Sequence, residues 1–103
     1  MNLDTDKPIV TIITIVFNNV KTIKNAINSV VSQDYQNIEH IVIDNNSNDG
    51  TFEAINEFKN EIALIVSEKD DGIYDALNKG LSLANGDIVG FLNSDDVLKK
   101  RNT

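Results

Sequence analysis

The stretch that decides the fold is IVTIITIVF, residues 9–17. It is a run of β-branched residues without strict alternation of apolar and polar side chains. That composition is typical of a strand buried on both faces, as in a parallel sheet covered by helices. Asn18 and Asn19 follow as a pair suited to cap a helix. Apolar residues then recur at helical spacing from Val20 to Ser32, so a strand and a helix open the pattern.

The alternation of strand and helix continues along the chain. Further strands are predicted at residues 38–43, 62–67 and 87–92, and further helices at residues 51–59 and 73–84. In the last helix, the residues expected to face inward are Ile73, Leu77, Leu81 and Ala84. The pattern β-α-β-α-β-α-β predicts an α/β fold: a Rossmann-like open parallel sheet of strand order 3-2-1-4 with helices on both faces. Residues 1–103 are interpreted as a single domain.

The composition excludes several classes of protein. Nine Lys and Arg against sixteen Asp and Glu give a net charge of −7, whereas a nucleic-acid partner requires a basic surface. There is no cysteine, so there is no disulfide framework, thiolate zinc site or cysteine nucleophile. His40 is the single histidine, and we expect it to have a structural role within its strand.

The sequence predicts no membrane-spanning segment. Its longest apolar-rich stretch, residues 9–17, is far too short to cross a bilayer. Residues 1–6 lack the positive charge that begins a signal peptide. We therefore expect a cytoplasmic location, peripheral to the inner face of the membrane in a longer protein.

Polar clusters follow all four predicted strands. They are Asn18-Asn19, Asp44-Asn45-Asn46-Ser47, Glu68 with Asp70-Asp71, and Asn93-Ser94-Asp95-Asp96. Open parallel sheets bind ligands beyond the carboxyl ends of the strands, where the strand order reverses. With the order 3-2-1-4, the first, second and fourth clusters converge on one crevice. The alternative is that these residues only form loops and helix caps.

Familiar phosphate- and metal-binding motifs are absent. The first strand is not followed by the G-x-G-x-x-G of dinucleotide folds, and Lys79-Gly80 has the wrong order for a P-loop. The run at residues 44–50 resembles an EF-hand loop only faintly. Gly50 comes one place late in it, and Ile55 stands at the twelfth position instead of Glu.

Asp95 and Asp96 are the sharpest chemical feature of the sequence. Adjacent carboxylates repel each other unless a cation lies beside them. A hard divalent cation prefers oxygen ligands and commonly bridges to substrate phosphates. Such an ion would also let a chain of net charge −7 bind a nucleotide diphosphate. The pair indicates a site for Mn²⁺ or Mg²⁺, and a solvated turn is the alternative.

Four segments of the chain together resemble a known family. They are ITIVFN at 13–18, EHIVIDNNSNDGT at 39–51, GIYDALNKG at 72–80 and GDIVGFLNSDD at 86–96. In this order and spacing, over residues 8–98, they resemble the nucleotide-sugar half of family-2 glycosyltransferases of the GT-A fold. The resemblance implies a truncated GT-A domain, a nucleotide-sugar donor, and inverting glycosyl transfer to an unknown acceptor in polysaccharide biosynthesis.

The resemblance also implies roles for individual residues. The nucleotide site would consist of Val16, Phe17, Asn18, Asp44, Asn45, Asp71, Gly72, Asn78 and Asp95, and the metal ligands would be Asp95 and Asp96. Phe17 would lie beside the base, and Asp44 would accept a hydrogen bond from it. The expected donor is UDP-linked. Two roles stay open for Tyr74 and Asp75: contact with the sugar, or packing at the start of a helix.

The chain departs from the family in three respects. Asn45 and Asn93 stand where the family often has Asp. The acceptor-binding half, which carries the general base, normally follows the acidic motif and is absent from residues 1–103, so we expect no sugar transfer by this chain alone.

Exposed apolar surface near the last strand is expected to favour a homodimer. Two other interpretations stay open: a non-catalytic nucleotide-binding or regulatory module, and a structural α/β domain.

Overall fold

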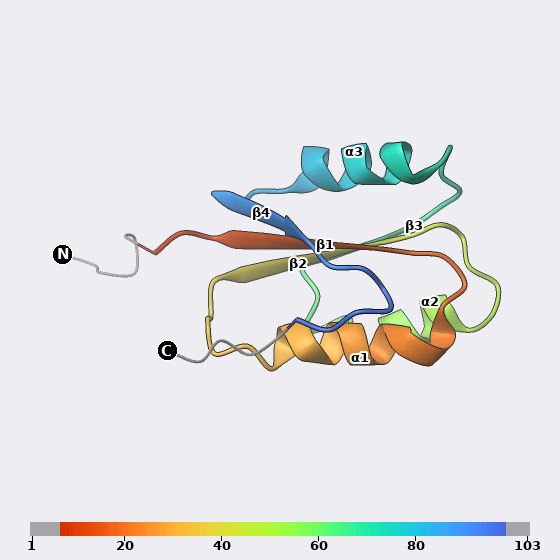
Figure 1. Ribbon diagram of the computed structural model, residues 1–103, viewed down its shortest axis with the longest axis horizontal. Helices are drawn as coiled ribbons and strands as arrows, with labels where there is room; N and C mark the ends of the chain where they lie inside the picture. Colours follow the sequence, from red (N-terminus) through yellow and green to blue (C-terminus); the bar gives the residue numbers. More distant parts are fainter. Residues whose placement is uncertain (1–6, 99–103) are drawn as a thin grey trace.

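The computed structural model describes residues 7–98 and contains an open parallel sheet (Figure 1). Its elements are β1 (Val10–Val16), α1 (Val20–Val31), β2 (Ile38–Asp44), α2 (Thr51–Asn56), β3 (Leu64–Ser67), α3 (Ile73–Leu83) and β4 (Ile88–Phe91). The strand order is β3-β2-β1-β4, and every pair is parallel. The predicted fold and strand order are therefore confirmed. Residues 1–6 and 99–103 of the predicted single domain lie outside the described residues.

The two central strands are buried on both faces of the sheet, as their β-branched sequences predict. Helices α1 and α2 cover one face, and α3 covers the other (Figure 1). The core between the sheet, α1 and α2 consists of Val16, Ile23, Ile27, Val42, Ala54, Ile55 and Ile62. Beneath α3 lies a smaller core of Ile13, Ile41, Ile43 and Ala76. The two layers hold the carboxyl ends of β1 and β2 in fixed register.

The predicted inward face of α3 is wrong for Ile73 and Leu81 only, because Leu77 is half-buried and Ala84 packs against the core beneath the helix. Ile73 and Leu81 are 63% and 48% exposed, and the buried residues of the helix are Ala76 and Gly80. A Cβ atom at position 80 would lie 2.7 Å from Cγ2 of Ile13, which shows how closely the helix approaches β1. Small residues allow that close approach, and it leaves the larger side chains at the margin of the contact.

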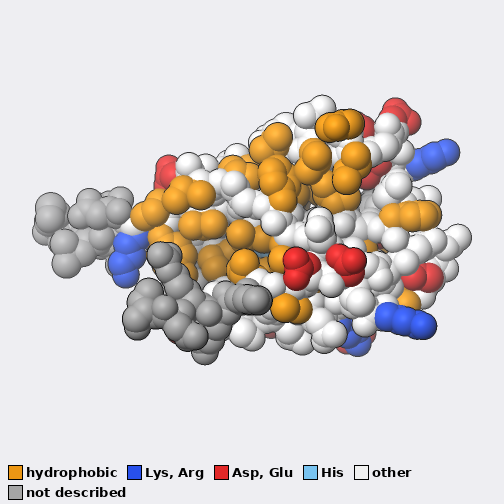
Figure 2. Space-filling model, viewed as in Figure 1, with side chains coloured by type: hydrophobic (Ala, Val, Ile, Leu, Met, Phe, Trp, Pro, Cys, Tyr) orange, Lys and Arg blue, Asp and Glu red, His pale blue; other side chains and the backbone are white. Residues whose placement is uncertain are grey.

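Strand β4 lies at the edge of the sheet and pairs only with β1 among the described strands. Its residues Ile88, Val89 and Phe91 are 53%, 36% and 53% exposed, and together they form what we call the β4 surface. Figure 2 shows hydrophobic side chains gathered on this face of the molecule, with acidic side chains close by. The expected exposed apolar surface near the last strand is therefore present.

Candidate functional site

The loops that follow β1, β2 and β4 meet at the carboxyl end of the sheet. The backbone N–H of Asn18 donates to Oγ of Ser47 at 2.8 Å, and the side chain of Asn18 accepts from the N–H of Asn48 at 2.8 Å. The side-chain amide of Asn19 donates to Oγ of Ser94 at 2.9 Å. These bonds bring together the first, second and fourth polar clusters, as the strand order predicts.

Two asparagines of these loops also adopt backbone conformations that most other residues disfavour. Asn18 and Asn46 have φ values of +47° and +52°, in the left-handed region that asparagine tolerates better than most residues. Asn19 precedes α1, but its side chain makes no capping bond and contacts Ser94 instead. Asn19 therefore occupies the expected N-cap position, but its side chain does not cap the helix. The first N–H of α1, from Val20, is instead directed at a carboxylate oxygen of Asp49, at 3.3 Å.

Asp49 and Thr51 complete this junction, and the sequence analysis did not single them out. Thr51 is fully buried, and its hydroxyl accepts from the N–H of Asn19 at 2.9 Å. The hydrogen bond from the Thr51 hydroxyl is the main cause that lowers the pKa of Asp49. The pair therefore secures the start of α1 to the loop after β2.

Asp44 ends β2 and is fully buried. Its Oδ1 accepts from the Ser47 hydroxyl at 2.5 Å, and its Oδ2 accepts from the Ser47 N–H at 3.1 Å and the Ser67 hydroxyl at 2.8 Å. A carboxylate offers about four acceptor directions, so three are occupied here. In this conformation Asp44 orders the loop, and its contact with a base stays a prediction.

The other residues predicted to bind the nucleotide differ in access. Phe17 is 58% exposed at the end of β1, so its ring is available for stacking. The side chain of Val16 is buried in the core, and its carbonyl accepts from the N–H of Asn45 at 2.9 Å. The exposed members of the predicted set beyond β3 are Asp71, Gly72 and Asn78. Tyr74 is 79% exposed, which argues against the packing role considered for it.

Asp95 and Asp96 are exposed in the turn after β4. The turn is closed by a bond from the N–H of Asp96 to the Asn93 carbonyl at 3.1 Å, and Thr22 of α1 donates to the Ser94 carbonyl at 2.9 Å. No group of three His, Cys, Asp or Glu side chains suited to a metal ion occurs within residues 7–98. Two adjacent carboxylates still fit a hard cation whose other ligands are phosphate and water oxygens.

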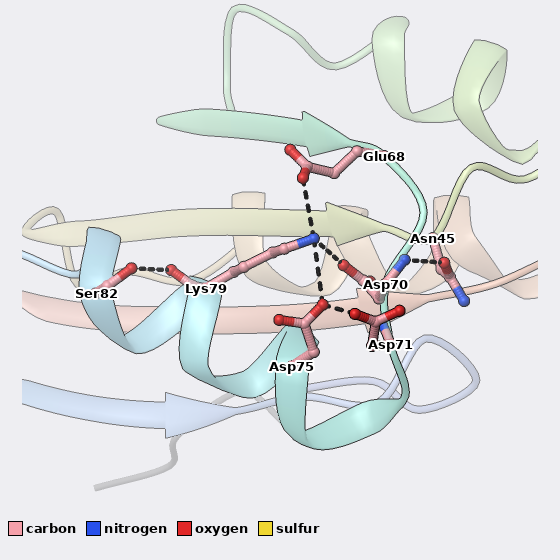
Figure 3. A network of polar contacts seen from close by, with 7 residues as sticks. All are labelled: Asn45, Glu68, Asp70, Asp71, Asp75, Lys79 and Ser82. Atoms are coloured by element: carbon pink, nitrogen blue, oxygen red, sulfur yellow. Dashed lines mark hydrogen bonds and ion pairs between the residues drawn. The ribbon is translucent and has the colours of Figure 1, made fainter.

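A cluster around Lys79 lies beside the same loops and was missed in the sequence analysis. The Lys79 ammonium contacts Asp70 closely and lies 3.1 Å from Glu68 and 3.6 Å from Asp75 (Figure 3). The hydrogen bond with Asp70 is the main cause that raises the pKa of Lys79. The spacing of Asp75 and Lys79, four residues apart, was the available sequence signal.

His40 lies within β2 and is buried, so its expected structural position is confirmed. Its Nε2 is 2.9 Å from the Thr14 hydroxyl, and its Nδ1 has no hydrogen-bond partner within the described part of the chain. Burial lowers the pKa of His40 from 6.5 to about 4, so the ring is neutral at pH 7. It stands away from the strand ends where the candidate site lies.

The parallel sheet of order β3-β2-β1-β4 is the fold of the GT-A glycosyltransferases. Residues 11–102 match the profile of glycosyl transferase family 2, and the chain belongs to that family. Helices long and apolar enough to cross a membrane are absent from residues 7–98.

Curated relatives are considerably longer than this chain. A Mycobacterium tuberculosis glycosyltransferase is 41% identical over 93 residues, which cover 89% of this chain and 36% of the relative. The putative teichuronic acid biosynthesis glycosyltransferase TuaG of Bacillus subtilis is 35% identical over 91% of this chain and 38% of its own length. The chain thus spans little more than a third of these relatives.

Solved structures show the same arrangement of strands and helices. The mannosyltransferase PcManGT of Pyrobaculum calidifontis, in complex with GDP-Man and Mn²⁺, matches with a TM-score of 0.81 and 32% identity, over 88% of this chain and 28% of that structure. S. aureus TarS residues 1–349, in complex with UDP-GlcNAc, matches with a TM-score of 0.82 and 28% identity, over 89% and 28%.

Proposed function

We propose that this chain is the donor-binding part of an inverting glycosyltransferase and binds a UDP-linked sugar through Mn²⁺ or Mg²⁺. The observation that carries the proposal is the meeting of three strand-end loops. Asn18 contacts the loop after β2, and Asn19 contacts Ser94 in the loop with Asp95 and Asp96. An aromatic ring and a pair of carboxylates are thereby displayed at one end of the sheet.

Each part of the site has a separate task in this proposal. Phe17 stacks on the base, while Asp44 and Asn45 recognise its polar edge. Asp71, Gly72 and Asn78 line the nucleotide on the α3 side, and Asp95 contacts the ribose. Asp95 and Asp96 would hold the metal ion.

A divalent ion supplies two kinds of chemistry at such a site. Held by Asp95 and Asp96, it would neutralise the diphosphate, which a chain of net charge −7 would otherwise repel, and it would stabilise the leaving diphosphate as a Lewis acid. The known complexes of related structures support a nucleotide-sugar donor: TarS is in complex with UDP-GlcNAc, and PcManGT with GDP-Man and Mn²⁺. The two differ in base, so the uracil preference is a prediction that competition between UDP and GDP tests.

Calorimetry with UDP, with and without Mn²⁺, tests the proposal. We expect binding that strengthens when Mn²⁺ is present. Absence of heat at millimolar UDP under both conditions would contradict it and favour a structural α/β domain. Binding without turnover, in a longer protein that contains this chain, would favour a non-catalytic nucleotide-binding module.

We also propose that residues 1–103 alone do not transfer sugar. Inverting displacement needs a base on the acceptor hydroxyl, on the side opposite the leaving diphosphate. Asp95 and Asp96 are assigned to the diphosphate side, and His40 is buried within β2 with a lowered pKa. Release of UDP from UDP-sugars with Mn²⁺, compared with a family-2 enzyme that includes an acceptor-binding half, measures this. Acceptor-dependent turnover near the rate of that longer enzyme would contradict it.

Self-association of the 103-residue chain is a further part of the proposal. The edge of β4 has backbone groups that no described strand pairs, and its exposed side chains are apolar. An edge strand of this kind is a template for the same strand of a second copy.

The cytoplasmic location stays a separate prediction, which fractionation of cells tests.

A further inference from the structure

Lys79 gathers three carboxylates that come from two elements. Glu68 and Asp70 belong to the loop after β3, and Asp75 lies in the first turn of α3 (Figure 3). The Lys79 side chain is 23% exposed, while that of Asp70 is 1% exposed. The contact with Asp70 is therefore largely withdrawn from water, unlike an ordinary surface ion pair.

Asp70 is the link between this cluster and the candidate nucleotide site. Its backbone N–H donates to Oδ1 of Asn45 at 2.7 Å. Since Oδ1 must be the acceptor, the NH₂ group of Asn45 is directed away from Asp70, as Figure 3 shows. The position of Asp70 thus sets the orientation of a side chain that is assigned to the base.

The same loop is fixed at two further points. The N–H of Glu68 donates to the Asp44 carbonyl at 3.0 Å, and the N–H of Asp71 donates to a carboxylate oxygen of Asp75 at 2.9 Å. The loop therefore connects the end of β2 with the start of α3. Asp71 and Gly72, both assigned to the nucleotide, lie within this connection.

The charge balance makes Lys79 necessary for this arrangement. Among the described residues, Lys79 is the only ion-pair partner of Asp70, and Oδ2 of Asp70 has no hydrogen-bond partner. Removal of the ammonium would leave a buried carboxylate uncompensated, with Glu68 and Asp75 nearby as like charges. Movement of the loop toward water is the direct way to relieve that state.

We propose that Lys79 is a positioning residue of the donor site, which holds residues 68–72 so that Asn45 and the Asp71-Gly72 segment face the nucleotide. The inference rests on the proposed function for its ligand, but its structural part is independent of binding. Lys79 itself need not touch the nucleotide. Its effect passes through Asp70 and the Asn45 amide.

The test compares three variants of the chain labelled with ¹⁵N. Lys79→Met removes the charge, Lys79→Arg keeps it, and Lys24→Met is a control with the same change in net charge. Lys24 pairs with Glu57 at 2.9 Å on the surface, with side chains 48% and 61% exposed. The measurements are the dissociation constant for UDP with Mn²⁺, corrected for the folded fraction, and the NMR signals of the Asn45 side-chain amide.

Lys79→Met is expected to weaken UDP binding about tenfold, the lower end of the loss seen when partners that orient metal ligands are removed. The Asn45 amide signals should shift, and hydrogen exchange at Asp71 and Gly72 should accelerate. Lys79→Arg should restore most of the affinity, and Lys24→Met should leave all three readouts unchanged. A purely structural lysine would lower stability without changing the affinity of the folded protein.

Unchanged Asn45 signals and unchanged affinity in folded Lys79→Met would overturn the inference. Failure of the wild-type chain to bind UDP would instead contradict the proposed function, while the Asn45 signals and hydrogen exchange would still decide the role of Lys79. If Lys79→Met does not fold, the double variant Lys79→Met/Asp70→Asn removes the buried charge together with its partner. Because no buried charge remains to move the loop toward water, it should keep near wild-type affinity and Asn45 signals, and a tenfold weakening in it would overturn the inference.

Discussion

Acidification is expected to destabilise this protein through one residue, His40. Burial lowers its pKa from 6.5 to about 4, because the charged ring would lose water without gaining a counter-charge. The unfolded chain therefore binds a proton at a pH where the folded chain does not. The free energy of unfolding is therefore unaffected by this residue above pH 6.5, and it decreases as the pH falls from 6.5 toward about 4.

The size of the effect follows from the shift. One pKa unit corresponds to about 1.4 kcal/mol, so the free energy of unfolding should fall by about 2 kcal/mol between roughly pH 7 and pH 5. Hydrogen bonds, chiefly from the Asn85 backbone to Glu39 and the Thr51 hydroxyl to Asp49, lower the pKa values of these two acids. Their stabilisation is lost mainly below the ordinary values of 4.5 and 3.8, so they contribute little above pH 5.

Urea unfolding at a series of pH values measures this loss, and His40→Gln is the matched variant. Whatever its absolute stability, the variant should lose much less stability than the wild type between pH 7 and pH 5. Because the chain has one histidine, NMR also reports the pKa of that ring directly. A ring that titrates near 6.5, or an equal pH dependence in His40→Gln, would refute the reasoning.

Three further changes have defined expected outcomes. Asp96→Ala should abolish the Mn²⁺ dependence of UDP binding and leave the fold intact. The control variant Glu61→Ala should keep that dependence. If calorimetry shows that both variants keep the Mn²⁺ dependence, the metal assignment is contradicted. Gly86→Ala should cost about 1–3 kcal/mol by overpacking, since its Cβ would lie 2.4 Å from Oγ1 of Thr11, while Gly90→Ala meets its nearest neighbour at 3.5 Å. Equal thermal stability of the two variants would exclude that clash. Phe91→Lys should shift the chain from dimer toward monomer in sedimentation experiments. An unchanged ratio of dimer to monomer would contradict an interface at β4.

The sheet was predictable because its evidence is local. The β-branched run of residues 9–17 marks a buried strand, and regular alternation with helices leaves few possible topologies. The inward face of α3 was not predictable from hydrophobicity, because Ala76 and Gly80 make the contact through their small size. The distance between α3 and the sheet determines which side chains of the helix are buried. That distance depends on contact with Ile13, which lies in β1.

The candidate site was predictable in composition but not in its internal contacts. Strand order alone indicated that the ends of β1, β2 and β4 would meet. The enclosure of Asp44 by Ser47 and Ser67, and the grouping of acids around Lys79, depend on side chains from separate loops. Asn19 looks like a helix cap in sequence, yet its amide contacts Ser94 across the site.

The most direct test of the account locates Mn²⁺ on the chain by NMR. With UDP present, Mn²⁺ should broaden backbone signals in the loops after β1, β2 and β4, including residues 93–97, and should leave signals around Gln36 and Glu61 sharp. Asp96→Ala should remove the broadening. Broadening spread over the acidic residues of the surface, or confined to another region, would contradict a donor site at the carboxyl end of this sheet.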